Sequence, residues 1–221
     1  MKIKTKNGLQ WAAICDRIMS DRNRVREMND VKLMDLFRPE RTDADDERDE
    51  PMNPADALVS AFARLTRGDA AVLSDISECL ADTAGYFSSR KEMLDGRGLR
   101  YSAEAEPWLC VVAAVGSALK SGYLQELRTD CTAGAFVSAL TMALAAAKIE
   151  FSPHRLAFDP QKDIGAWAAQ FNEYAGQSGI TLYFVELYGE SRVMGAARLA
   201  DYAEAAESAG FAGVKITSRP C

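Results

Sequence analysis

The stretch that decides the fold is TLYFVELYGESRVMGAARLADYAEAAESAGFAGVKI, residues 181–216. Residues 181–188 are largely apolar on both alternating faces, a pattern typical of a strand that is covered on both sides. The connection Gly189-Glu190-Ser191 is short enough for a hairpin, so residues 192–197 are expected to return antiparallel to this strand. A helix over residues 199–210 and an edge strand over 214–216 complete a hairpin–helix–strand unit.

Helical patterns dominate the rest of the chain. Asn53 before Pro54 is a favourable helix start, and Asp69 is expected to cap the next helix, whose apolar side runs as far as Phe87. Thr132 is expected to begin an alanine-rich helix. Further predictions are a strand over residues 123–128 and helices over 107–122 and 161–179. We therefore expect an α+β (α/β-like) fold, rich in helix, with a small mixed sheet and a C-terminal β-hairpin–α–β unit.

The composition divides the chain into three parts. Residues 1–37 carry an apolar stripe and are predicted to form an N-terminal helical segment. Residues 38–53 hold seven acids and three arginines with no apolar periodicity, so they are predicted to be an acidic flexible linker or loop. Residues 54–221 are expected to form a helix-rich domain with the sheet near its C-terminus.

Charge and hydrophobicity exclude several classes of protein. Hydrophobic residues make up 48% of the chain, enough to bury a core, and the net charge of −6 argues against a general affinity for nucleic acid or anionic membrane. No apolar run approaches the ~20 residues that span a bilayer. The apolar patch after the N-terminal lysines is broken at once by Asp16 and Arg17, so we expect a cytoplasmic protein rather than a secreted one.

The cysteines do not suggest a disulfide framework or a zinc site. The chain has five of them at wide spacings, with no C-x-x-C. Cys79 and Cys110 are expected to be small residues of the core or its margin.

Two segments resemble a known family. They are EPWLCVVAAVGSALKSGYLQELR, residues 106–128, and LYFVELYGESRVMGAARLADYAEAAESAG, residues 182–210. Together they resemble a family of bacterial proteins, the domain of unknown function 6630, over roughly residues 106–217. The resemblance implies an α/β domain and brings no activity with it.

Few residues are candidates for chemistry. His154 is the sole histidine, and Ser117 and Lys120 match S-x-x-K without its companion motifs. Glu186 lies on a strand expected to be covered on both sides, so it must be paired, exposed near an edge, or perturbed. An enzyme or small-ligand binder would have to assemble its site from the following residues: His154, Arg155, Glu186 and Tyr188.

We favour a non-enzymatic, cytoplasmic protein-binding protein, such as an inhibitor, immunity or adaptor protein, with no catalytic residue, metal or cofactor expected. Its partner would be a protein, with a basic surface if the acidic run binds it, rather than nucleic acid or membrane. The candidate partner-binding residues are Asp43, Asp45, Asp46, Glu47, Asp49 and Glu50. The alternatives are the ligand site above and a structural subunit of a homo-oligomer; the oligomeric state stays open.

Overall fold

The hairpin predicted from residues 181–197 is present and lies at the centre of the sheet. Strand β2 (Ile180–Val185) pairs antiparallel with β3 (Ser191–Arg198). Strand β1 (Leu124–Arg128) adds to β3 and the short β4 (Ile216–Thr217) adds to β2, so the strand order is β1-β3-β2-β4. The α+β fold with a small sheet is confirmed, and its pairings are all antiparallel rather than mixed.

The computed structural model describes residues 52–90, 106–187 and 191–219, which lie within one compact unit of the chain. The predicted helical segment 1–37 and the acidic residues 43–50 lie outside these ranges. The described helices are α2 (Pro54–Leu65), α3 (Ala70–Ala81), α4 (Thr83–Ser89), α6 (Glu106–Lys120), α7 (Ala133–Ala146), the 3-10 turn η2 (Pro153–Arg155), α8 (Ile164–Gly176) and α9 (Leu199–Phe211).

Capping side chains fix where the helices begin. Asn53, Asp69 and Thr132 accept hydrogen bonds from backbone N–H groups in the first turns of α2, α3 and α7, as predicted. The single helix predicted from Asp69 to Phe87 is wrong, because the chain breaks at Asp82. The Asp82 carboxylate accepts from the Gly85 N–H at 2.9 Å and so starts α4 as a separate helix. An aspartate competes for nearby backbone N–H groups in this way, which apolar periodicity alone does not register.

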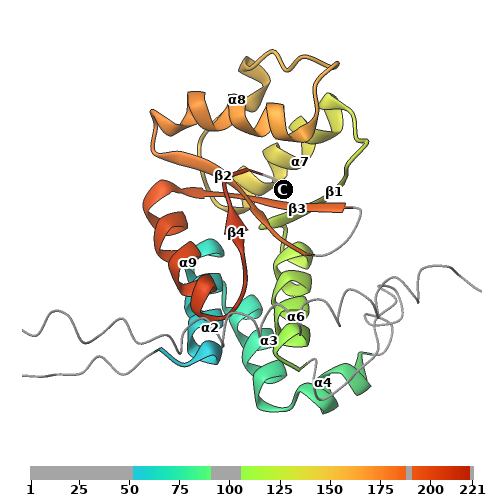
Figure 1. The fold of residues 1–221 in the computed structure, drawn as a ribbon, viewed down its shortest axis with the longest axis vertical. Helices are drawn as coiled ribbons and strands as arrows, with labels where there is room; N and C mark the ends of the chain where they lie inside the picture. The colour runs from blue at the N-terminus through green and yellow to red at the C-terminus, as the bar shows by residue number, and fades with distance from the viewer. Residues whose placement is uncertain (1–51, 91–105, 188–190, 220–221) are drawn as a thin grey trace, which may run out of the picture. The chain divides into compact units, whose positions relative to one another are not determined.

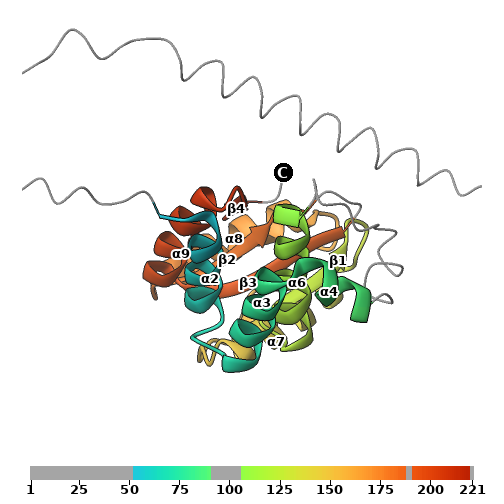
Figure 2. The ribbon, with the colours of Figure 1, turned by 90° about the horizontal axis from the view of Figure 1, so that it is seen from below.

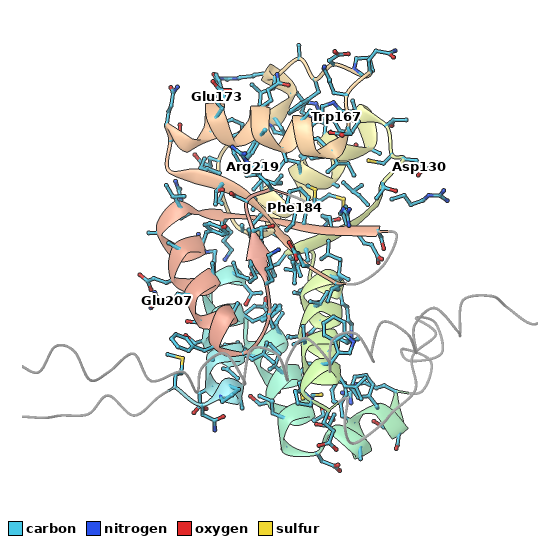
Figure 3. All side chains as sticks on the ribbon, in the orientation of Figure 1. Asp130, Trp167, Glu173, Phe184, Glu207 and Arg219 are labelled. Carbon is cyan, nitrogen blue, oxygen red and sulfur yellow. The ribbon has the colours of Figure 1, made fainter. Side chains whose placement is uncertain are left out.

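Helices α7 and α8 cover one face of the sheet (Figure 1). Phe184 of β2 lies at the middle of the sheet, below Trp167 of α8 (Figure 3). Alternate residues of the two central strands belong to this apolar core: Ile180, Leu182 and Phe184 of β2, and Met194 and Ala196 of β3. Its largest members are Phe136, Leu140, Trp167, Phe171, Leu182, Phe184 and Met194.

The other face of the sheet is covered by α2, α6 and α9, and α3 packs against α2 and α6. Figure 2, seen from this side, shows α2, α3, α6 and α9 in front of the strands. Thr181, Tyr183 and Val185 of β2 alternate with the residues of the first core, and all three are buried. Strand β2 is therefore buried on both faces, which confirms the prediction from its sequence.

Tyr183 fits against β3 because the residue opposite it is a glycine. Gly195 pairs with Tyr183 in the register, and a Cβ at Gly195 would lie 2.4 Å from the tyrosine hydroxyl oxygen and 2.9 Å from Leu124 Cδ2. The Tyr183 hydroxyl is buried without a hydrogen-bond partner among the described residues, and burial raises its pKa. Its ring stacks on Tyr202 of α9 at 6.1 Å between centroids. The close approach of two strands and a helix thus depends on a missing side chain.

Asn172 completes the outer edge of β2. The short β4 pairs only with Phe184 and Val185, which leaves the peptide of Leu182 without a strand partner on that side. Asn172, on α8, accepts from the Leu182 N–H at 2.7 Å and donates to the Leu182 carbonyl at 3.0 Å. It also donates to the Ser218 carbonyl at 3.0 Å. One side-chain amide therefore replaces a strand partner at the edge and also binds the segment that follows β4 at Ser218.

The turn between α2 and α3 fixes the far end of α7. The Arg67 guanidinium donates to the carbonyl of Ala147 at 3.1 Å, at the end of α7. Arg67 and Lys148 both have positive φ, +55° and +52°, in the left-handed region that favours glycine. The ends of two helices on opposite sides of the sheet are joined at this point.

The packing of Tyr183 against Gly195 predicts that adding one methyl group at position 195 strongly destabilises the fold. Gly195→Ala should lower the free energy of unfolding by about 1–3 kcal/mol, because the new Cβ overlaps Tyr183 and Leu124. Gly210→Ala is the matched control, since a Cβ there meets no atom within 4 Å. In a helix this change should raise the free energy of unfolding by about 0.5–1 kcal/mol. Urea denaturation of both variants measures this, and equal stability of the two would contradict the packing described.

Candidate functional site

The residues predicted for a small-ligand site are not brought together. His154 and Arg155 are exposed in η2, which packs beside α7. Glu186 follows the end of β2, where its carboxylate pairs with Lys215 Nζ at 2.9 Å and its N–H donates to the Lys215 carbonyl. Of the three possibilities predicted for Glu186, pairing is the one observed. Tyr188 lies outside the described residues.

The Ser117–Lys120 pair does not form a reactive site either. Both residues lie on α6, but Ser117 is buried while Lys120 is exposed. Within residues 52–90, 106–187 and 191–219, no group of three acidic, histidine or cysteine side chains is placed to hold a metal ion. None of the helices in these ranges is long and apolar enough to cross a membrane. The acidic candidates Asp43, Asp45, Asp46, Glu47, Asp49 and Glu50 lie outside them.

The outer face of α7 is the first feature that suggests a function. We use this name for the exposed or half-exposed residues Gly134, Ala135, Ser138, Thr141, Met142 and Ala145. Met142 is 57% exposed, and the others are small. Among the described helices longer than α4, α7 alone has no charged side chain. Helices that face water usually carry charge on the side away from the core, so this face is unusual.

The polar groups of this face are already satisfied. The Ser138 hydroxyl donates to the Gly134 carbonyl at 3.0 Å, and the Thr141 hydroxyl donates to the Val137 carbonyl at 2.8 Å. Neither hydroxyl requires water as its acceptor. Within the described residues, the positions of this face are exposed or half-exposed, so no described element covers it. The face can therefore be covered without leaving a buried donor unpaired.

The second feature is a pair of buried thiols. Cys79, near the end of α3, donates to Cys110 Sγ of α6 across 3.8 Å. Thr83, at the start of α4, lies 3.5 Å from the same sulfur and also donates to the Cys79 carbonyl. The two cysteines are separated by many residues, so sequence analysis predicts two core residues but not their contact. What the sequence does indicate is that each cysteine lies on the apolar side of a predicted helix.

A polar network ties α4 to α3 beside the thiols. Tyr86 donates to Asp75 at 2.9 Å. Arg90 forms ion pairs with Asp75 at 3.2 Å and with Glu78 at 2.9 Å, and its guanidinium lies 3.9 Å from the centre of the Tyr86 ring. Burial and the hydrogen bond to Asp75 raise the pKa of Tyr86, and the Arg90 hydrogen bond lowers the pKa of Glu78. The network adds polar contacts to a short helix whose apolar anchors are the buried Tyr86 and Phe87.

One known family matches most of the chain. Residues 55–220 match the model of the family described as Domain of unknown function (DUF6630). The chain belongs to this family. The match confirms the resemblance seen in the sequence and extends it to α2, α3 and α4, which the resemblance had left outside. No curated protein and no solved structure matches the chain.

Two tyrosines test whether the α4 network stabilises the fold. Tyr86→Phe removes a hydroxyl bonded to Asp75 and should lower the free energy of unfolding by about 1 kcal/mol. Tyr183→Phe removes a hydroxyl that has no partner, and should leave stability unchanged or raise it by about 1 kcal/mol. Thermal and urea unfolding of the two variants give the comparison. A larger loss for Tyr183→Phe than for Tyr86→Phe would show that the hydroxyl assignments are wrong.

Proposed function

We propose that the protein is a non-enzymatic, cytoplasmic protein-binding protein of the inhibitor, immunity or adaptor kind, and that the outer face of α7 is its binding surface. The observation that supports this most is the complete absence of charge from this fourteen-residue helix, although one side of it faces solvent. A large exposed methionine among small residues is typical of a contact surface rather than of an ordinary solvated helix.

The energetics favour an apolar protein partner. Covering Met142 and the alanines removes apolar area from water at about 25 cal/mol per Å². No charge on this face has to be desolvated, and the two hydroxyls keep their acceptors within the helix. A partner that placed a charge against this face would bury it without a counter-charge, which is costly. The partner is therefore a protein that presents an uncharged, apolar surface, and the small residues allow one of its helices to approach closely.

The acidic run has a separate role in this proposal. Residues 43–50 would speed the encounter by attracting a basic region of the same partner, away from the apolar contact itself. Such steering acts on the association rate and weakens as salt rises. The net charge of −6 supports a protein partner over nucleic acid, which attracts positively charged surfaces.

A second candidate function is that of a subunit of a homo-oligomer. The outer face of α7 has both a protruding side chain, Met142, and small residues, Ala135 and Ser138, one turn or two away. In an antiparallel pair of α7 helices, Met142 of each copy would oppose Ser138 of the other. An uncharged face meets itself without like-charge repulsion, which a two-fold contact requires.

One substitution on this face tests the proposal. Met142→Glu should leave the free energy of unfolding within about 0.5 kcal/mol, because the side chain is exposed. It should weaken partner binding at least about tenfold, because the contact would bury an unpaired carboxylate. Leu199→Glu is the matched control: Leu199 is 49% exposed but begins α9, on the other side of the sheet. Its binding should equal that of the wild type.

The partner for this test is a protein that co-elutes with the full chain from its native host at a fixed ratio. It is re-isolated and titrated calorimetrically into each purified variant. Binding that tolerates Met142→Glu, or that Leu199→Glu weakens equally, contradicts the proposed surface. A dimer of the chain alone that Met142→Glu dissociates in sedimentation favours the second candidate. A monomer that co-elutes with no protein contradicts both.

The small-ligand alternative is tested by the sole histidine. Because His154 is an exposed residue of η2, His154→Ala should leave partner binding within a few-fold of wild type. A loss of all binding in a folded His154→Ala protein would favour a functional site around η2 over the outer face of α7.

A further inference from the structure

We propose that Cys79 and Cys110 form a reversible disulfide by reaction with low-molecular-weight disulfides, which makes the junction of α3, α4 and α6 a redox modification site. This proposal does not depend on the binding surface on α7. It rests on the contact between the two sulfurs, on their placement in two helices that pack together, and on the network that holds α4 beside them.

The geometry is close to that of a disulfide. The sulfurs lie 3.8 Å apart, and a disulfide requires about 2.05 Å, so they must approach by about 1.8 Å. Both cysteines project from the facing sides of α3 and α6, and both are free thiols. We infer that rotation of the two side chains supplies this approach, because α3 and α6 already pack against each other.

The two thiols differ in role. Cys110 accepts a hydrogen bond from the Cys79 thiol, and Thr83 Oγ1 lies within reach of the same sulfur. The hydrogen bond from Cys79 favours the Cys110 thiolate and lowers its pKa, whereas the hydrogen bond to Cys110 and burial raise the pKa of Cys79. The thiolate is the nucleophile in disulfide exchange. Cys110 is therefore the attacking residue, and Cys79 resolves the mixed disulfide.

Helix α4 controls access to the pair. Cys79 is 0% and Cys110 5% exposed, so a reagent reaches them only when the structure opens locally. Helix α4 is seven residues long, packs against both α3 and α6, and places Thr83 beside the thiols. Its far end is held to α3 by Arg90, through ion pairs with Asp75 and Glu78. Release of Arg90 is the step that frees α4.

The reaction balances without any further oxidant. The Cys110 thiolate attacks one sulfur of the small disulfide, so that its S–S bond breaks, a mixed disulfide forms at Cys110 and the first small thiolate leaves. Cys79 then loses its proton and attacks Cys110 Sγ, which releases the second small thiolate. The two protons of the protein thiols end on the two leaving groups. Two electrons pass from the protein to the small disulfide, which becomes two thiols.

To test this, the native full chain is incubated with oxidised glutathione and its free thiols are rapidly alkylated. Mass spectrometry of the peptides then shows which cysteines are free, bound to glutathione or joined to each other. The expected product is a peptide pair joined between Cys79 and Cys110 that a dithiol reductant separates again. Cys131→Ser is the control, because Cys131 is half-buried and lies away from the pair, and this variant should react like the wild type. Cys79→Ser should stop at a mixed disulfide on Cys110.

The role of α4 is tested on the wild-type cysteines. Arg90→Ala should speed formation of the Cys79–Cys110 disulfide about fivefold, because it removes a partly exposed ion-pair network that closes α4. This variant keeps both thiols, so the result does not depend on whether cysteine variants fold. The proposal is overturned if the native pair stays reduced while Cys131 reacts, or if the disulfide forms only in denaturant. An unchanged rate in Arg90→Ala overturns the role of α4.

Discussion

The burial of β2 on both faces is the constraint on which the rest of the structure depends. A strand with no solvated side needs two layers of helix, and the remaining elements supply them: α7 and α8 on one face, and α2, α6 and α9 on the other. Tyr183 of β2 lies directly against Gly195 of β3. Because glycine has no side chain, the tyrosine ring can pack across β3 at this position. Asn172 then closes the edge that the short β4 leaves open.

The candidate functional features lie away from this centre. The outer face of α7 is on the far side of a helix whose inner side is in the core, and the thiol pair is at the junction of α3, α4 and α6. Figure 3 shows the contrast between the buried residues around Phe184 and outward-pointing side chains such as Glu207 of α9. Neither feature includes a residue of β2. A contact surface and a local opening can therefore both be accommodated without loss of the core.

Much of the fold could be predicted from the sequence, because local physics determined it. The apolar residues on both faces of the strand around Tyr183 predicted that it is covered on both sides, and Asn53, Asp69 and Thr132 marked helix starts. The break at Asp82 could not be predicted from periodicity, since a capping side chain overrides the apolar stripe there. The contact of Cys79 with Cys110 depends on how α3 and α6 pack, which no spacing within one helix reveals. The uncharged outer face of α7 could not be predicted either, because the sequence does not reveal which side of that helix faces solvent.

Native-state hydrogen exchange at low denaturant concentrations tests the central role of β2 most directly. If the doubly buried strand holds both helix layers, the most protected amides of β2 and β3 should exchange only through global unfolding, with the full free energy and denaturant dependence of that transition. Amides of α4 should exchange through a smaller local opening, because a polar network holds that helix in place. Exchange of the protected β2 amides at a lower free energy than those of α4 would contradict the account.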